Sequence, residues 1–62
     1  MNNIDKAKVY DECIRESDKL QRINSKLKSE YPINMPEHIQ VQVDQNNLKI
    51  SQLVQRLNNL FI

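Results

Sequence analysis

The segment IQVQVDQNNLKISQLVQRLNNL, residues 39–60, decides the fold. Within it, one set of positions recurs in alternating steps of four and three residues: Ile39, Val43, Asn46, Ile50, Leu53, Leu57 and Leu60. This heptad spacing places all of these positions along one stripe of an α-helix, and every one except Asn46 is apolar. The pattern predicts a helix over about residues 36–61 that packs along its length against another helix.

The first half of the chain predicts that second helix, over about residues 4–30. Its stripe is less apolar and comprises Val9, Cys13, Glu16, Leu20, Ile23 and Leu27. Asn2 or Asn3 is a suitable N-terminal cap, and Asp5 lies where a negative charge favours a helix N-terminus. On the outer surface, Asp11/Arg15 and Asp18/Arg22 are spaced as stabilising acid-first pairs, four residues apart.

Two prolines mark the connector between the helices. Pro32 disfavours a helical conformation at the preceding residue, so the first helix is expected to end by about residue 30. Pro36 suits the first turn of the next helix, which predicts a connector over residues 31–35. Asn34 or Met35 is the expected cap of that helix, and Glu37 is placed as a capping-box acid would be.

Two helices of similar length and a connector of about five residues can only fold back on each other. The expected fold class is therefore all-α, a single antiparallel helical hairpin spanning residues 1–62. A chain of this size buries too little surface to be comfortably stable alone, and its one cysteine cannot form an internal disulfide. We therefore expect self-association into a dimeric four-helix bundle or a coiled-coil-like oligomer, or docking on a different protein.

Several apolar side chains lie outside the two stripes and imply a second interface. The candidate interface residues are Tyr10, Ile14, Val41, Leu48, Val54 and Phe61, together with the polar Asn46. A buried asparagine among leucines can fix register by pairing with its own copy across a dimer axis. Alternatively, Asn47 or Leu48 replaces Asn46 through a local shift of the stripe. Glu16 either flanks the edge of the stripe or pairs with a basic residue of another chain.

Residues 39–43 also alternate as a half-buried strand would, with Asp44 capping a shorter helix. In this alternative, INMPEHIQ and LKISQLVQRL within residues 33–60 resemble ribbon-helix-helix repressors. The resemblance implies a DNA-binding dimer with Ile33, Asn34 and Met35 on the ribbon and Asn34 facing bases. The chain departs from the pattern in having a shorter stretch between Pro36 and Ser51, no glycine, and no counterpart for residues 1–30.

The residues offer little for catalysis. A hairpin of this length has no large concave site, and the absence of glycine excludes glycine-rich phosphate loops. Cys13 falls on the stripe, where a small buried thiol is expected, and His38 is expected to be a surface residue. We therefore expect no enzyme activity, no cofactor and no metal.

Charge gives no strong support to nucleic-acid binding. Residues 1–31 carry seven Lys or Arg against six Asp or Glu, and residues 32–62 carry two against two. A small DNA- or RNA-binding regulator remains the alternative function, through a basic edge of Lys19, Arg22, Lys26 and Lys28. The favoured expectation is a non-enzymatic protein-interaction module that regulates, inhibits or scaffolds a partner. Abundant Asn, Lys and Ile with no Gly, a bias that AT-rich genomes produce, suggests a phage, and thus viral, source or a low-GC bacterial one. The lone cysteine and lack of an apolar span suggest the cytoplasm without membrane association.

Overall fold

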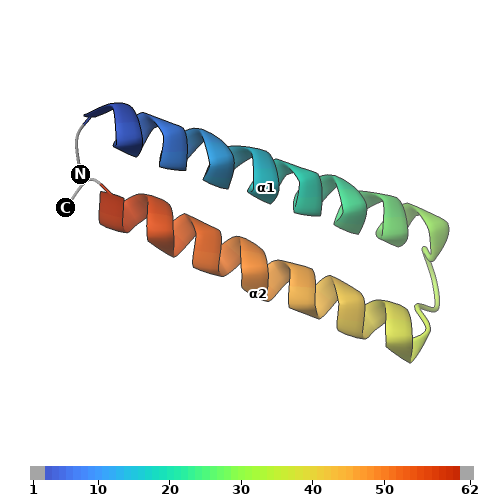
Figure 1. Ribbon diagram of the computed structural model, residues 1–62. Coiled ribbons are helices and arrows are strands. Elements are labelled where there is room, and N and C mark those ends of the chain that lie inside the picture. Colours follow the sequence, from blue (N-terminus) through green and yellow to red (C-terminus); the bar gives the residue numbers. More distant parts are fainter. Residues whose placement is uncertain (1–2, 61–62) are drawn as a thin grey trace.

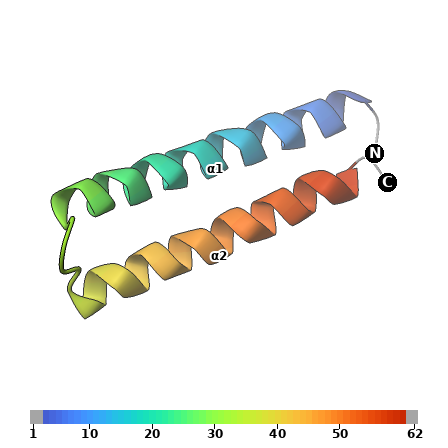
Figure 2. The same cartoon turned by 180° about the vertical axis from the view of Figure 1, so that it is seen from behind.

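The computed structural model describes residues 3–60, with side chains described from residue 5 onward. Within this range the chain forms two α-helices, α1 (Asn3–Glu30) and α2 (Glu37–Leu60). The helices lie antiparallel and side by side along their length, and the connector closes one end of the pair (Figures 1 and 2). The all-α helical hairpin expected from the sequence is confirmed.

The hairpin is an elongated rod. Its extents are 47 × 15 × 13 Å and its radius of gyration is 14.4 Å, whereas a compact domain of this length has a radius of about 10–11 Å. The shape follows from the sequence, because no glycine or proline interrupts either helix and the short connector holds the helices together. Most side chains consequently face solvent on at least one side.

The connector lies between Glu30 and Glu37, and it contains both prolines, Pro32 and Pro36. The amide of Tyr31 donates to the carbonyl of Leu27 at 3.0 Å, which extends the hydrogen bonding of α1 just beyond Glu30. At the start of α2 the carbonyl of Pro36 accepts from Ile39 and Gln40, at 3.0 and 2.9 Å. Pro36 is thus the last residue before the helix. The expected cap Asn34 is exposed, and no side-chain cap from it is found among the described residues.

The strand alternative for residues 39–43 is wrong, because this segment lies inside α2 and the described residues contain no strand. The alternating pattern is instead a short coincidence within the longer heptad pattern. Val41, which a strand would place on the same side as Ile39 and Val43, is 46% exposed on the outer surface of the helix. The ribbon-helix-helix architecture therefore does not form.

The shielded positions of α2 coincide with its heptad stripe. Val43 and Leu53 are buried, and the other members of the stripe are half-buried: Ile39, Asn46, Ile50, Leu57 and Leu60. Every other residue of the helix is exposed. One stripe of α2 therefore makes most of the contact with α1.

The shielded positions of α1 differ from the expected stripe at two places. Cys13 is buried, and Val9, Leu20, Ile23 and Leu27 are half-buried, but Glu16 is exposed and Ser17 is buried in its place. Asn24 is also buried, at 5% exposure. The stripe shifts because an α-helix has 3.6 residues per turn, so a straight helix drifts away from a strict heptad spacing.

Candidate interaction surface

A cluster of three asparagines joins the helices near the connector half of the hairpin. The Nδ2 of Asn46 donates to Oδ1 of Asn24, and the Nδ2 of Asn24 donates to Oδ1 of Asn47, both at 2.9 Å. The buried amide of Asn24 is therefore satisfied on both its oxygen and its nitrogen. Because a buried amide without partners is costly, this network fixes which residues of α1 and α2 lie level with each other.

The cluster places Asn46 within its own chain. Asn46 donates to Asn24, and Asn47 joins the network without replacing Asn46 on the stripe. Pairing of Asn46 with its own copy across a dimer axis stays a prediction. Hydrophobic patterning could not identify Asn24, because it flags apolar residues and Asn24 lies beside the apolar Ile23. The only available signal was that a polar stripe position at 46 needs a polar partner across the helix pair.

One broad side of the hairpin is charged. A groove of about 250 Å³ there is lined by Glu12, Cys13, Glu16, Lys49, Leu53 and Arg56. The acids come from α1 and the bases from α2, with Cys13 and Leu53 between them. We call this side the charged face. Glu16 thus takes the edge position that the sequence offered as one of its two alternatives.

The other broad side carries exposed apolar and amide groups. The groove residues Glu12, Glu16, Lys49 and Arg56 each precede a stripe position and share one side. Residues that follow a stripe position, such as Tyr10, Ile14 and Val54, therefore point toward the other side. We call this side the uncharged face and define it by Tyr10, Ile14, Gln21, Asn47 and Val54. Tyr10, Ile14 and Val54 are 45%, 42% and 44% exposed. They form an apolar patch in the half of the hairpin away from the connector.

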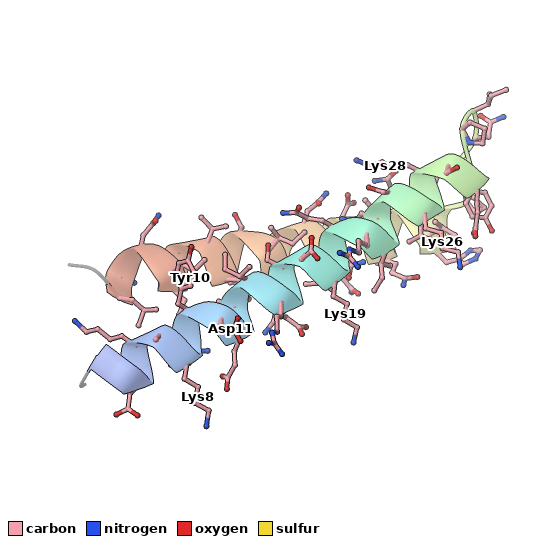
Figure 3. The ribbon with its side chains drawn as sticks, turned by 90° about the horizontal axis from the view of Figure 1, so that it is seen from above. Lys8, Tyr10, Asp11, Lys19, Lys26 and Lys28 are labelled. Atoms are coloured by element: carbon pink, nitrogen blue, oxygen red, sulfur yellow. The ribbon has the colours of Figure 1, made fainter. Side chains whose placement is uncertain are left out.

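Lysines divide between the two broad sides. In Figure 3, Lys8, Lys19 and Lys26 project to one side of α1, whereas Lys28 projects to the same side as Tyr10. The basic edge expected from Lys19, Arg22, Lys26 and Lys28 is therefore broken, because Lys28 faces away from Lys19 and Lys26. Arg22 is also paired with Asp18 at 3.0 Å.

The remaining apolar candidates lie elsewhere. Val41 and Leu48 are 46% and 61% exposed and occupy the outer surface of α2, away from α1. They are surrounded by exposed amides at Gln45, Gln52, Gln55 and Asn59. Phe61 lies outside the described residues. The structure therefore brings together Tyr10, Ile14 and Val54 but separates Val41 and Leu48 from them.

The groups considered for catalysis or metal binding are far apart. Cys13 is 2% exposed inside the half of the hairpin away from the connector, whereas His38 is exposed in the first turn of α2 beside the connector. No cluster of three or more His, Cys, Asp or Glu suited to a metal ion occurs among the described residues. Neither helix, over its described length, has an apolar stretch that could cross a bilayer.

Comparisons with protein-family models, with curated proteins and with solved structures give no match to this chain.

Proposed function

We propose that this chain is a non-enzymatic protein-interaction module whose uncharged face binds a second copy, forming a four-helix bundle. The observation that carries the proposal is the apolar patch of Tyr10, Ile14 and Val54, exposed next to a thin core. The buried hydrophobic residues of the described chain are only Cys13, Val43 and Leu53. A second hairpin would cover the patch and turn a two-helix contact into a four-helix core.

Exposed area supports a partner of this size. The chain exposes 5009 Å², whereas a compact monomer of 7.4 kDa exposes about 4200 Å². The excess of about 800 Å² equals the area that each partner contributes to a standard protein interface. A second copy of the same hairpin would remove this excess from water.

The uncharged face is the better interface of the two broad sides. Covering it desolvates mainly apolar groups and amides, which cost less to remove from water than ionised groups, and Lys28 lies only at its connector end (Figure 3). Covering the charged face would desolvate Glu12, Glu16, Lys49 and Arg56, and exposed ion pairs return only about 0–1 kcal/mol each. Apolar burial on the uncharged face contributes about 25 cal/mol per Å², so it is the stronger driving force.

Light scattering on the size-exclusion peak tests the proposal. The unmodified chain is expected to have the mass of a dimer, and Ile14→Lys is expected to have that of a monomer, because the lysine would place a charge inside the interface. Leu48→Lys is the matched control, since Leu48 is an equally apolar, more exposed residue on the outer surface of α2. A monomeric unmodified chain, or equal dissociation by the two variants, would contradict the proposal.

The biological role that fits such a module is regulation, inhibition or scaffolding of another macromolecule. The lone buried cysteine supports a reducing compartment such as the cytoplasm. Abundant Asn, Lys and Ile with no Gly, as AT-rich genomes encode, supports a phage or viral source. If the unmodified chain is monomeric and poorly helical, a different protein takes the place of the second copy.

Nucleic-acid binding is the second candidate, because Lys8, Lys19 and Lys26 project to the same side (Figure 3). Phosphate contacts would give an affinity that falls steeply between low and moderate salt. Fluorescence anisotropy with labelled duplex DNA and RNA at low salt tests this. Binding that Lys19→Gln/Lys26→Gln weakens, with Lys28→Gln as the control, would favour it. No binding at low salt would remove it.

A further inference from the structure

The asparagine cluster shows which residues of α1 and α2 lie at the same height along the hairpin, that is, level with each other. Asn24 bonds to both Asn46 and Asn47, so residues of α1 and α2 whose numbers sum to about 70 lie level with each other. Val54 is therefore level with residues 16–17 of α1, close to Ile14. The apolar patch thus occupies the half away from the connector, and Lys28 lies near the connector end of the uncharged face (Figure 3).

Two symmetric arrangements can place a second copy on this face. In the same-end arrangement the two-fold axis runs parallel to the helices, so α1 packs on α2 of the partner and both connectors lie at one end. In the opposite-end arrangement the axis crosses the helices, so α1 packs on α1, α2 on α2, and the connectors lie at opposite ends. Both are isologous, with the same patch used by each copy.

We infer that the dimer proposed above uses the same-end arrangement, so that the apolar patches of both copies meet while the hairpins overlap along their full length. This inference rests on the proposed dimer and specifies how its two copies are arranged.

Apolar matching favours the same-end arrangement. A two-fold axis parallel to the helices keeps every residue level with its own copy. Ile14 then faces α2 of the partner about two or three residues from the level of Val54, a separation of about 4 Å along the rod. Tyr10 also remains in the apolar half of the partner. Both patches are covered without shifting either hairpin.

In the opposite-end arrangement, the apolar patches cannot meet while the hairpins overlap along their full length. Full overlap reverses the levels about the middle of the helices, so Tyr10 lies over Gln21 and the buried Asn24 of the partner. Sliding one copy to restore apolar contact would leave the connector ends uncovered. The apolar area buried therefore falls in either version.

Distances between spin labels on the connector distinguish the arrangements. Ile33 is 89% exposed and lies outside both helices, so a label there leaves the interface intact. The experiment uses Ile33→Cys in a Cys13→Ala background, or Cys13→Val if circular dichroism shows lost helix, and Asn34→Cys as a second site. Pulsed dipolar resonance is measured on protein whose dimer mass and helicity match the unmodified chain.

In the same-end arrangement the labels lie on adjacent hairpins with helix axes about 8–10 Å apart, so separations below roughly 25 Å are expected. Separations approaching the 47 Å length of the hairpin, at either connector site in a dimeric sample, would overturn the arrangement. A monomeric mass would instead remove the proposed dimer itself. The two failures are therefore distinguishable.

Discussion

The two helices of the hairpin differ in how they are held. α1 places Ser17 and Asn24 in its contact stripe and carries two exposed ion pairs on its outer surface, Asp11–Arg15 at 3.1 Å and Asp18–Arg22 at 3.0 Å. α2 has an apolar stripe interrupted only by Asn46, and its outer surface is mostly amides with Val41 and Leu48.

This difference implies two sources of helix stability. Ion pairs four residues apart stabilise α1 locally, even when it is only partly packed. α2 lacks such ion pairs over its described length and depends on packing its stripe against α1, because helical stability in proteins comes mainly from burial of an amphipathic face. Perturbing the stripe of α2 should therefore have the largest effect on unfolding.

Leu53→Ala should cause the largest loss. Leu53 is 8% exposed and packs next to Cys13 at the base of the charged-face groove, so truncation leaves a cavity. The expected cost is about 2–5 kcal/mol in free energy of unfolding, measured by urea denaturation at fixed protein concentration. Leu20→Ala on α1 is the comparison, and it should cost less because Leu20 is only half-buried. Equal costs would mean that the two stripes contribute alike.

Asn24→Ala should have an intermediate effect, and it tests the polar part of the α1 stripe. The substitution removes both 2.9 Å hydrogen bonds and leaves the amides of Asn46 and Asn47 without this partner. Each buried group left unsatisfied costs about 1–3 kcal/mol, less where water can enter. The expected loss, followed by the same denaturation, is therefore about 1–3 kcal/mol.

The matched control for this substitution is Asn34→Ala in the connector, because Asn34 is exposed. A loss at Asn24 no larger than that at Asn34 would show that the asparagine cluster contributes nothing to stability. In that case the level of one helix against the other would be set by apolar packing alone.

Asp18→Asn should have the smallest effect, and it tests local stabilisation of α1. The Asp18–Arg22 side chains are 54% and 80% exposed, so removing the ion pair should cost about 0.3–0.5 kcal/mol. This cost should shrink as salt is added, because exposed charges are screened. Asp44→Asn on α2 is the control, since Asp44 accepts from the neutral amide of Gln40. A loss at Asp18 that does not vary with salt would contradict the ion-pair explanation.

The contrast between the helices also explains which parts of the fold could be predicted from the sequence. The hairpin follows from two long helical segments and a short proline-bounded connector, and the α2 stripe stands out because its members are mostly Ile, Leu and Val. The α1 stripe could not be read in full, because Ser17 and Asn24 are small polar residues that hydrophobic periodicity does not mark. Glu16 fits a heptad count on a linear sequence but is turned outward by the real helical period.

The interaction surface could not be predicted from the linear sequence, because it depends on the tertiary structure. Tyr10, Ile14 and Val54 are visible as surplus apolar residues in the sequence, and so are Val41 and Leu48, but nothing in the linear order separates the two groups. Their separation depends on which edge of each helix turns to the same broad side once the helices pair antiparallel.

The sequence by itself determined the two helices, their lengths and their antiparallel return, because these depend on local periodicity, proline geometry and chain reach. Only the tertiary structure decided the level of one helix against the other and the division into a charged and an uncharged face. The level depends on the contacts of Asn24 with Asn46 and Asn47, groups more than twenty residues apart whose pairing no local pattern specifies. The division depends on which edge of each helix turns to the same broad side once the helices pair.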